Sequence, residues 1–190
     1  MTSRIINQLI HFNAAGDELR RVQLPDDAAP WHAVESPTGT FIVSNRNRQL
    51  QQNQIIEVNT AGKVLRQFSR SHLPSDSASV APHVGVDSHG NVFAADSHRI
   101  LLLDAHLGLR RVIVDEHQFN YRQPRRLSYI EQSGQLFVVL YSRVVDFDVL
   151  CLKQSATGGH ISAITGHLSQ ASEDSSVHRV IFEHTTIVTD

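Results

Sequence analysis

Short apolar segments alternate with turns that contain Gly, Asn, Asp or Ser along most of the chain. Three of these segments, residues 40–44, 91–95 and 135–139, are rich in Val, Ile and Phe and contain no Pro. A Pro there would remove an N–H from the sheet, and β-branched and aromatic residues favour strands. None of the segments keeps the 3.6-residue period of a helix. The pattern therefore predicts an all-β protein built from short strands.

One sequence pattern occurs in three copies, at residues 30–59, 82–104 and 124–146. In each copy a Pro opens an apolar segment, a turn with Gly follows, and a second apolar segment, a polar loop and a third apolar segment complete the unit. Residues 8–24 also match residues 54–69. Four strands in about 40–45 residues is the spacing of a β-propeller blade. The sequence predicts a β-propeller, or a propeller fragment, of four-stranded antiparallel blades, about three of them full, with half-blades at the ends.

Stacked blades cover each other, so successive side chains of a strand should face opposite neighbours. We expect Val92 and Ala94 to face one neighbouring blade and Gly85 and Phe93 to face the other. The carboxylate of Asp87 is expected to cap its turn with hydrogen bonds. Three turn glycines are expected to have positive φ angles: Gly62, Gly90 and Gly108.

The phrase PHVGVDSHGNVFAADSHRILLLD at 82–104 resembles an NHL repeat. In that family a Pro-Gly-apolar-Val-Asp opening leads through Gly-Asn to an aromatic-Val-Ala-Asp strand and then to His-Arg-Ile. The resemblance covers about residues 5–165 and implies a propeller that serves as an interaction platform. Members often follow zinc-binding ubiquitin-ligase domains, and the single Cys leaves no such domain in this chain. The other two units keep the Arg of the His-Arg pair, as Arg48 and Arg143, and replace Asp96 by Asn45 and Leu140.

The repeat also predicts how the chain is divided. The propeller part is assigned to residues 1–165, with a half-blade at 5–22 and blades at 30–69, 82–114 and 124–165; residues 166–190 are a Ser-rich linker and a C-terminal strand or hairpin. Two arrangements remain open. The C-terminal hairpin could pair with the N-terminal strands and close a split blade, or the arc could stay open. The poor match of the ending favours the open arc, whose unpaired edges favour homo-oligomerisation.

Composition narrows the class of protein. The 190 residues are 41% hydrophobic and 19% charged, with a net charge of −2, so no global field draws the chain to nucleic acid or membrane. The lone Cys151 excludes an internal disulfide framework and a Cys-rich zinc module. No apolar run approaches the roughly 20 residues of a membrane span, and residues 1–12 do not form a secretory signal. We expect a cytoplasmic protein without membrane contact.

The expected binding residues lie at one end of the blades. In a four-stranded meander the blade-to-blade connections and the loops between second and third strands share an end, here called the long-loop end, and loops of variable length usually carry binding. Arg supplies 15 of the 17 basic residues and binds carboxylates and phosphates bidentately. Acidic residues map to the same end, and Arg99 is expected to pair with Asp96. The candidates are Arg46, Arg48, His83, His98, Arg99, Tyr121, Arg122, Arg125, Arg126 and Arg143.

These observations favour a non-catalytic module that binds a protein partner through the long-loop end, and the NHL resemblance implies substrate recognition in a larger ubiquitin-ligase-type system. RNA binding by the same Arg residues is the alternative, with Tyr121 and Trp31 as stacking groups. A metal-dependent lyase or lactonase is a lesser alternative. The 12 His show no metal-ligand spacing and are expected to be solvent groups in turns and loops. No nucleophile, phosphate-loop or dinucleotide motif occurs, so no enzymatic activity, cofactor or metal is expected.

Overall fold

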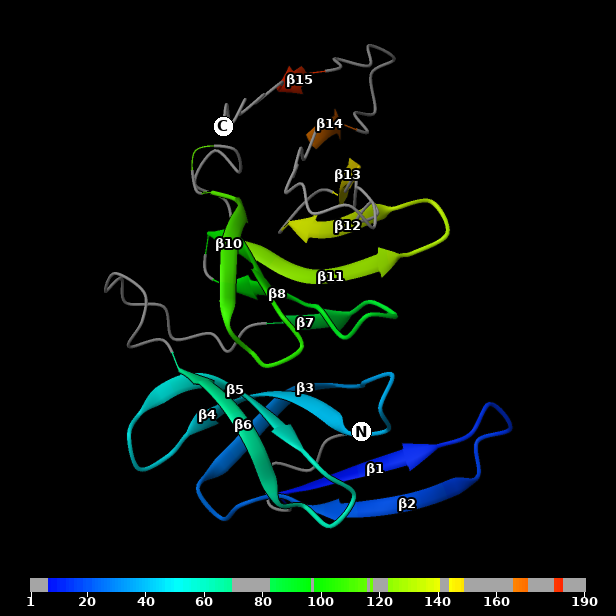
Figure 1. The fold of residues 1–190 in the computed structure, drawn as a ribbon, viewed down its shortest axis with the longest axis vertical. Helices are drawn as coiled ribbons and strands as arrows, with labels where there is room; N and C mark the ends of the chain where they lie inside the picture. Colours follow the sequence, from blue (N-terminus) through cyan, green and yellow to red (C-terminus); the bar gives the residue numbers. More distant parts are fainter. Residues whose placement is uncertain are drawn as a thin grey trace, which may run out of the picture.

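The computed structural model describes residues 7–69, 83–96, 98–115, 117 and 123–140, together with the backbone of three further strands. The described part of the chain contains β-strands and no helix. The strands form antiparallel sheets that follow one another in sequence order (Figure 1). The half-blade contains β1 (Gln8–Phe12) and β2 (Glu18–Gln23). The first full blade contains β3 (Ala28–Glu35), β4 (Phe41–Asn47), β5 (Gln52–Val58) and β6 (Val64–Ser69).

The second full blade contains β7 (His83–Val86), β8 (Val92–Asp96), β9 (Arg99–Leu103) and β10 (Leu109–Val114). The last sheet contains β11 (Pro124–Ile130), β12 (Gln135–Leu140), β13 (Val144–Asp148), β14 (Gly166–Gln170) and β15 (Val180–Phe182). Both full blades are four-stranded meanders. The predicted fold class, a β-propeller or propeller fragment of four-stranded blades, is therefore confirmed.

Each sheet packs face to face on the next, and a separate apolar core fills each of the three gaps. Along the second full blade, Val92 and Ala94 join the core shared with the first full blade, whereas Phe93 joins the core shared with the last sheet. A Cβ on Gly85 would meet the Cδ1 of Leu127 in β11 at 2.8 Å, so Gly85 also faces the last sheet. The predicted alternation is confirmed, and it explains why these strands are apolar on both faces.

The turns between strands place single residues in the left-handed region. Gly16 has a φ of 88°, Gly62 of 81° and Gly90 of 80°. The prediction for Gly108 is wrong, because the preceding Leu107 takes the left-handed position with a φ of 62°. Leu107 donates its N–H to the carbonyl of the residue three positions earlier, as Gly16 and Gly62 do in their turns. Gly108 instead lies against the carboxylate of Asp104, which accepts its N–H at 2.8 Å.

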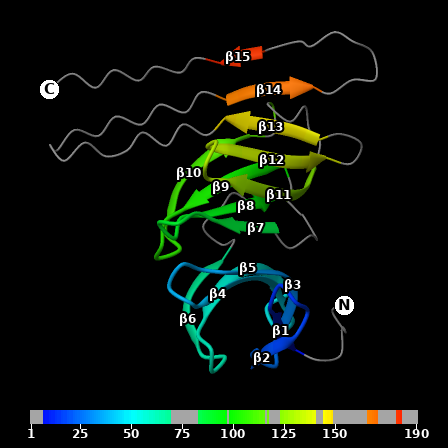
Figure 2. The same cartoon turned by 90° about the vertical axis from the view of Figure 1, so that its right-hand side faces the viewer.

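The half-blade and β15 lie at opposite ends of the stack. Figure 2 shows the half-blade at the bottom and β15 at the top, with the sheets arranged in sequence order between them. In the described part of the chain, β15 pairs with β14 and not with β1 or β2, so the intramolecular closure of a split blade is not formed. The domain limits themselves stay predictions.

The connections separate into two ends as a meander requires. The turns between β1 and β2 and between β11 and β12 point to one side in Figure 1, and the turn between β4 and β5 points to the other. The first side holds the tight turns. The second side is the long-loop end, where β2 leads into β3 through Leu24–Asp27 and β4 into β5 through residues 48–51. The first strands of the three larger sheets, β3, β7 and β11, therefore begin at the long-loop end and end at a tight turn. Because they contact one another from blade to blade, we call them the inner strands.

Candidate functional site

Two histidines from successive inner strands stack on each other near the long-loop end. His32 lies on β3 and His83 opens β7, and their ring centroids are 3.5 Å apart at an angle of 28°. The Nδ1 of His32 accepts the backbone N–H of Val84 at 3.4 Å. A strand at the inner edge of a blade has unpaired N–H groups, and here the imidazole of the preceding blade binds one of them. The stack is thus a contact between blades.

The same contact is repeated one blade further on. The Nδ1 of His83 accepts the backbone N–H of Leu127 in β11 at 3.4 Å. An imidazole nitrogen that accepts a hydrogen bond carries no proton, so each neutral ring has its proton on Nε2. The expectation that these histidines are solvent groups in turns and loops is therefore wrong for His32 and His83. They lie on strands and join blades.

Arg126 is the counterpart of His32 and His83 in the last sheet. It pairs across its hairpin with Val139, as His83 pairs with Ala95 and His32 with Ser44. Burial lowers the pKa of His83 to about 4, with His32 and Arg126 contributing, and burial followed by the charge of Arg126 lowers the pKa of His32. Both rings are therefore neutral near pH 7. The inner edge combines two Nε2–H donors with one exposed guanidinium.

The remaining predicted residues of the long-loop end are bound mostly to neutral groups. Arg46 donates to the side-chain oxygen of Gln51 at 2.7 Å, and Arg48 donates to that of Asn7 at 3.1 Å. Arg125 is exposed on β11 and has a further interaction within the fold. Tyr121, Arg122 and Arg143 were predicted as binding residues and lie outside the described residues.

Arg99 and His98 belong to the blade rather than to an open surface. Arg99 donates to the carboxylate of Asp96 at 3.5 Å, and both side chains are largely buried, which confirms the predicted pair. His98 lies in the short turn between β8 and β9 with its Nδ1 buried and without a hydrogen-bond partner among the described atoms. The structure thus brings together His83 and Arg126, and it places His98 and Arg99 at the neighbouring turn between β8 and β9.

Two residues of this inner edge, His32 and Trp31, are absent from the list of candidate binding residues, although the sequence predicts Trp31 as a stacking group for RNA. His32 forms the stack, and the preceding Trp31 is 49% exposed although it lies on the innermost strand. A register shift between Pro30 and His32 accompanies this exposure. Such a bulge turns a side chain away from the regular alternation. The adjacent Pro-Trp-His triplet was the available signal, since it differs from the Pro-His of the next repeat.

The described residues offer no set of side-chain ligands for a metal ion. Among them, no group of three or more His, Cys, Asp and Glu side chains could hold an ion. Glu35, Asp87 and Glu131 lie beside the tight turns. Asp87 accepts the N–H groups of His89 and Asn91, and Glu131 accepts the N–H and hydroxyl of Ser88 in the preceding blade. Asp87 thus stabilises its own turn, and Glu131 binds the turn of the preceding blade.

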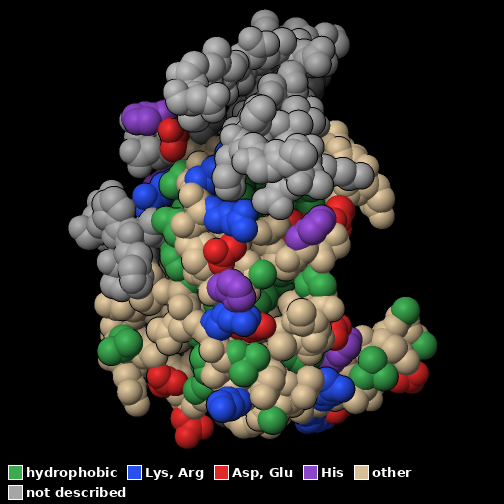
Figure 3. All heavy atoms as spheres, viewed as in Figure 1, with side chains coloured by type: hydrophobic (Ala, Val, Ile, Leu, Met, Phe, Trp, Pro, Cys, Tyr) green, Lys and Arg blue, Asp and Glu red, His purple; other side chains and the backbone are tan. Residues whose placement is uncertain are grey.

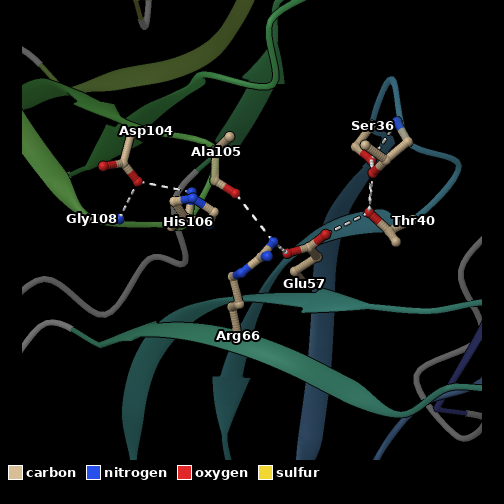
Figure 4. Close-up of polar contacts among 9 residues, drawn as sticks. Ser36, Thr40, Glu57, Arg66, Asp104, Ala105, His106 and Gly108 are labelled. Atoms are coloured by element: carbon tan, nitrogen blue, oxygen red, sulfur yellow. Dashed lines mark hydrogen bonds and ion pairs between the residues drawn. The ribbon is translucent and has the colours of Figure 1, made fainter.

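Charged side chains elsewhere are interspersed rather than gathered. The face drawn in Figure 3 carries acidic, basic and His side chains next to one another. On the tight-turn side, the buried Glu57 accepts from Thr40 at 2.7 Å and from Arg66 at 2.5 Å, and Arg66 also donates to the carbonyl of Ala105 at 3.3 Å (Figure 4). This network binds the first full blade to the second. It is a structural contact between blades.

The fold and the contacts between successive blades define a protein of the β-propeller type. A catalytically inactive variant of virginiamycin B lyase from Staphylococcus aureus, a β-propeller solved with quinupristin, matches with a TM-score of 0.56 at 13% identity, over 94% of this chain and 64% of that one. A protein of unknown function from Bacteroides caccae matches with a TM-score of 0.48 at 13% identity, over 86% of this chain and 64% of that one. This chain thus spans 64% of the length of each. The likeness to the lyase supports the fold alone.

Comparisons of sequence add no family. No family model and no curated protein match the chain. The NHL resemblance therefore stays a prediction. Among the described residues, no helix has the length and apolar character that a membrane crossing requires.

Proposed function

We propose that this chain is a non-catalytic binding module that holds an acidic segment of a protein partner at the long-loop end. The proposal rests on Arg side chains of the long-loop end that are not paired with carboxylates in the described part of the chain. Among the described residues, Arg46 and Arg48 bond to neutral amides, and Arg126 is exposed beside two neutral imidazoles. An Arg that is not already ion-paired can bind a partner carboxylate through two parallel hydrogen bonds.

The acidic residues of the same end leave this charge largely available. Asp27 accepts from the side chain of Asn47 at 2.6 Å, and Asp96 is paired with Arg99. Asp26 is exposed in the connection to β3. By contrast, Arg66 on the tight-turn side is bound to a carboxylate of its own chain. The difference between the two ends favours ligand binding at the long-loop end.

RNA binding at the same end is the second candidate, and Trp31 favours it. A half-exposed indole such as that of Trp31 can stack on a base, which is how single strands are commonly held. Trp31 also suits an interface with protein, because Trp and Arg are enriched at interface centres. The net charge of −2 argues against a strong general affinity for nucleic acid.

Fluorescence anisotropy with two labelled probes, an oligoglutamate peptide and an oligouridine, separates the candidates. We expect the chain to bind the peptide, Arg126→Gln and Arg46→Gln each to weaken binding by roughly tenfold, and Arg110→Gln on the outer strand β10 to leave it unchanged. Tighter binding of the oligouridine, reduced by Trp31→Ala, would establish the RNA candidate instead. Binding of neither probe, or equal loss in Arg110→Gln, would contradict both.

A further inference from the structure

Three hydrogen-bond donors at the inner edge, from His32, His83 and Arg126, have no partner in the fold. Each imidazole accepts a backbone N–H through its Nδ1, so each carries its proton on Nε2. Within the described part of the chain, neither Nε2 is a buried atom and neither ring has a further hydrogen bond. The guanidinium of Arg126 is exposed and has no hydrogen bond or ion pair there.

The three groups lie close together. The ring of His83 lies 3.4 Å from the backbone nitrogen of Leu127, the residue that directly follows Arg126. The ring of His32 stacks on that of His83 and makes the same contact with the inner strand that follows its own. The two Nε2–H groups therefore have similar orientations. The charge of Arg126 acts on both rings, since it contributes to the lowered pKa of each.

No carboxylate of the described residues occupies this edge. The acidic residue nearest to His83 in the register of its hairpin is Asp96, which follows the paired Ala95. Its carboxylate is bound to Arg99 in the turn between β8 and β9. A cation and two neutral N–H donors without an acceptor of their own suit an anionic ligand, because hydrogen bonds to an ionised acceptor are the stronger ones.

The number of donors favours phosphate over carboxylate. A carboxylate has two oxygens, and a single guanidinium can bind both of them. A phosphate monoester has three acceptor oxygens and a charge of about −1.5 to −2 at pH 7. It can therefore accept from the guanidinium and from an imidazole at the same time. A phosphodiester in RNA has one negative charge and one terminal oxygen fewer, so it uses this set of donors less fully.

We propose that the inner edge binds the phosphate of a phosphorylated side chain in an acidic segment of the protein partner. This inference rests on the proposed function, because it assigns a phosphate subsite to the same end of the blades. Arg126 binds two of the phosphate oxygens, and the Nε2–H of His83 donates to the third. The hydrogen bonds at Nδ1 already hold the imidazoles in place, so little side-chain entropy is lost when the ligand binds.

Fluorescence anisotropy with two matched peptides tests the subsite. Both are labelled oligoglutamates, one with phosphoserine and one with serine at the centre. We expect the phosphoserine peptide to bind at least about tenfold more tightly. His83→Asn, which keeps an acceptor near the Nδ1 position and removes the Nε2–H, and Arg126→Gln should each abolish most of this preference. Arg46→Gln should weaken both peptides and keep the preference, and Arg110→Gln on β10 should change neither.

Nuclear magnetic resonance of the histidine side chains provides a second measurement, which needs no variant. The phosphoserine peptide should shift the Nε2 resonances of His32 and His83 in the native chain, and the serine peptide should shift them much less. Nε2 resonances that do not move with either peptide would overturn the subsite. So would a phosphoserine preference that both His83→Asn and Arg126→Gln retain.

The peptides also separate this proposal from the proposed function. Equal affinity for the phosphoserine and serine peptides would overturn the phosphate subsite and leave the binding of acidic segments standing. Binding of neither peptide would contradict both. Displacement of the phosphoserine peptide by a small excess of oligouridine, lost in Trp31→Ala, would assign the edge to RNA and overturn the proposal.

Discussion

The ring centroids of His32 and His83 lie 3.5 Å apart although the two residues are 51 positions apart in the chain. Each ring accepts an N–H from the inner strand of the following blade. The histidines therefore satisfy backbone groups that the meander leaves unpaired, and they do so only while neutral. The same rings form the inner edge at which a ligand is proposed to bind.

Acid should destabilise the fold through this contact. The pKa of His83 is about 4 in the folded chain and roughly 6.5 in an unfolded one. Between these values the unfolded chain binds more protons, so the free energy of unfolding falls as the pH is lowered from about 6.5 toward 4. We expect a loss of about 1–2 kcal/mol between pH 7 and pH 5, reduced by partial exposure. Urea titrations at both pH values measure it.

Two matched variants show whether His83 causes that loss in the free energy of unfolding. His83→Gln should lose part of the pH dependence because it cannot titrate, whereas His106→Gln, at an exposed turn position, should keep the native profile. An unchanged profile in His83→Gln would show that the ring is not held neutral by the fold.

Two turn glycines separate backbone strain from contact between blades. Gly16 and Gly62 have nearly the same φ, but a Cβ on Gly16 meets no atom within 4 Å, whereas a Cβ on Gly62 would lie 1.9 Å from the carbonyl oxygen of Gln23. We expect Gly16→Ala to cost about 1 kcal/mol from the left-handed backbone alone. Gly62→Ala should cost several times more, roughly 3 kcal/mol. Equal losses in thermal denaturation would mean that the half-blade does not pack there.

Leu107 should respond to substitution in an unusual order. Its side chain is buried in the core between the full blades, and its φ is 62°. Leu107→Ala should cost about 2–5 kcal/mol through lost packing. Leu107→Gly loses the same packing but relieves the backbone, so it should be more stable than Leu107→Ala by about 1 kcal/mol. Chemical denaturation ranks the two variants, and the reverse order would rule out a strained turn.

The Glu57–Arg66 pair should depend on both partners. Arg66→Met leaves the buried carboxylate of Glu57 without its cation, and we expect a loss of about 1–3 kcal/mol at pH 7, since Arg66 is partly exposed. Adding Glu57→Gln removes the buried charge and should recover part of that loss. A double variant less stable than Arg66→Met, measured by urea denaturation, would contradict this role.

The sequence predicted the blades because their periodic apolar segments and turn glycines survive in each copy. It also predicted the Asp96–Arg99 pair, which is local to one turn. It failed at Leu107, because the repeat drifts by one residue and a nearby Gly108 suggested a match. It did not align Arg126 with the two histidines, because the last hairpin has one more residue between the paired positions: Arg126 to Val139 spans 13 residues and His83 to Ala95 spans 12.

Nuclear Overhauser spectroscopy on the whole chain tests the central claim, that successive blades stack face to face and assemble the binding edge. The account predicts cross-peaks between the ring protons of His32 and His83, and between those of Phe93 and Tyr129, whose centroids lie 4.6 Å apart. Cross-peaks confined to neighbours within each sheet, with neither of these ring contacts, would contradict it.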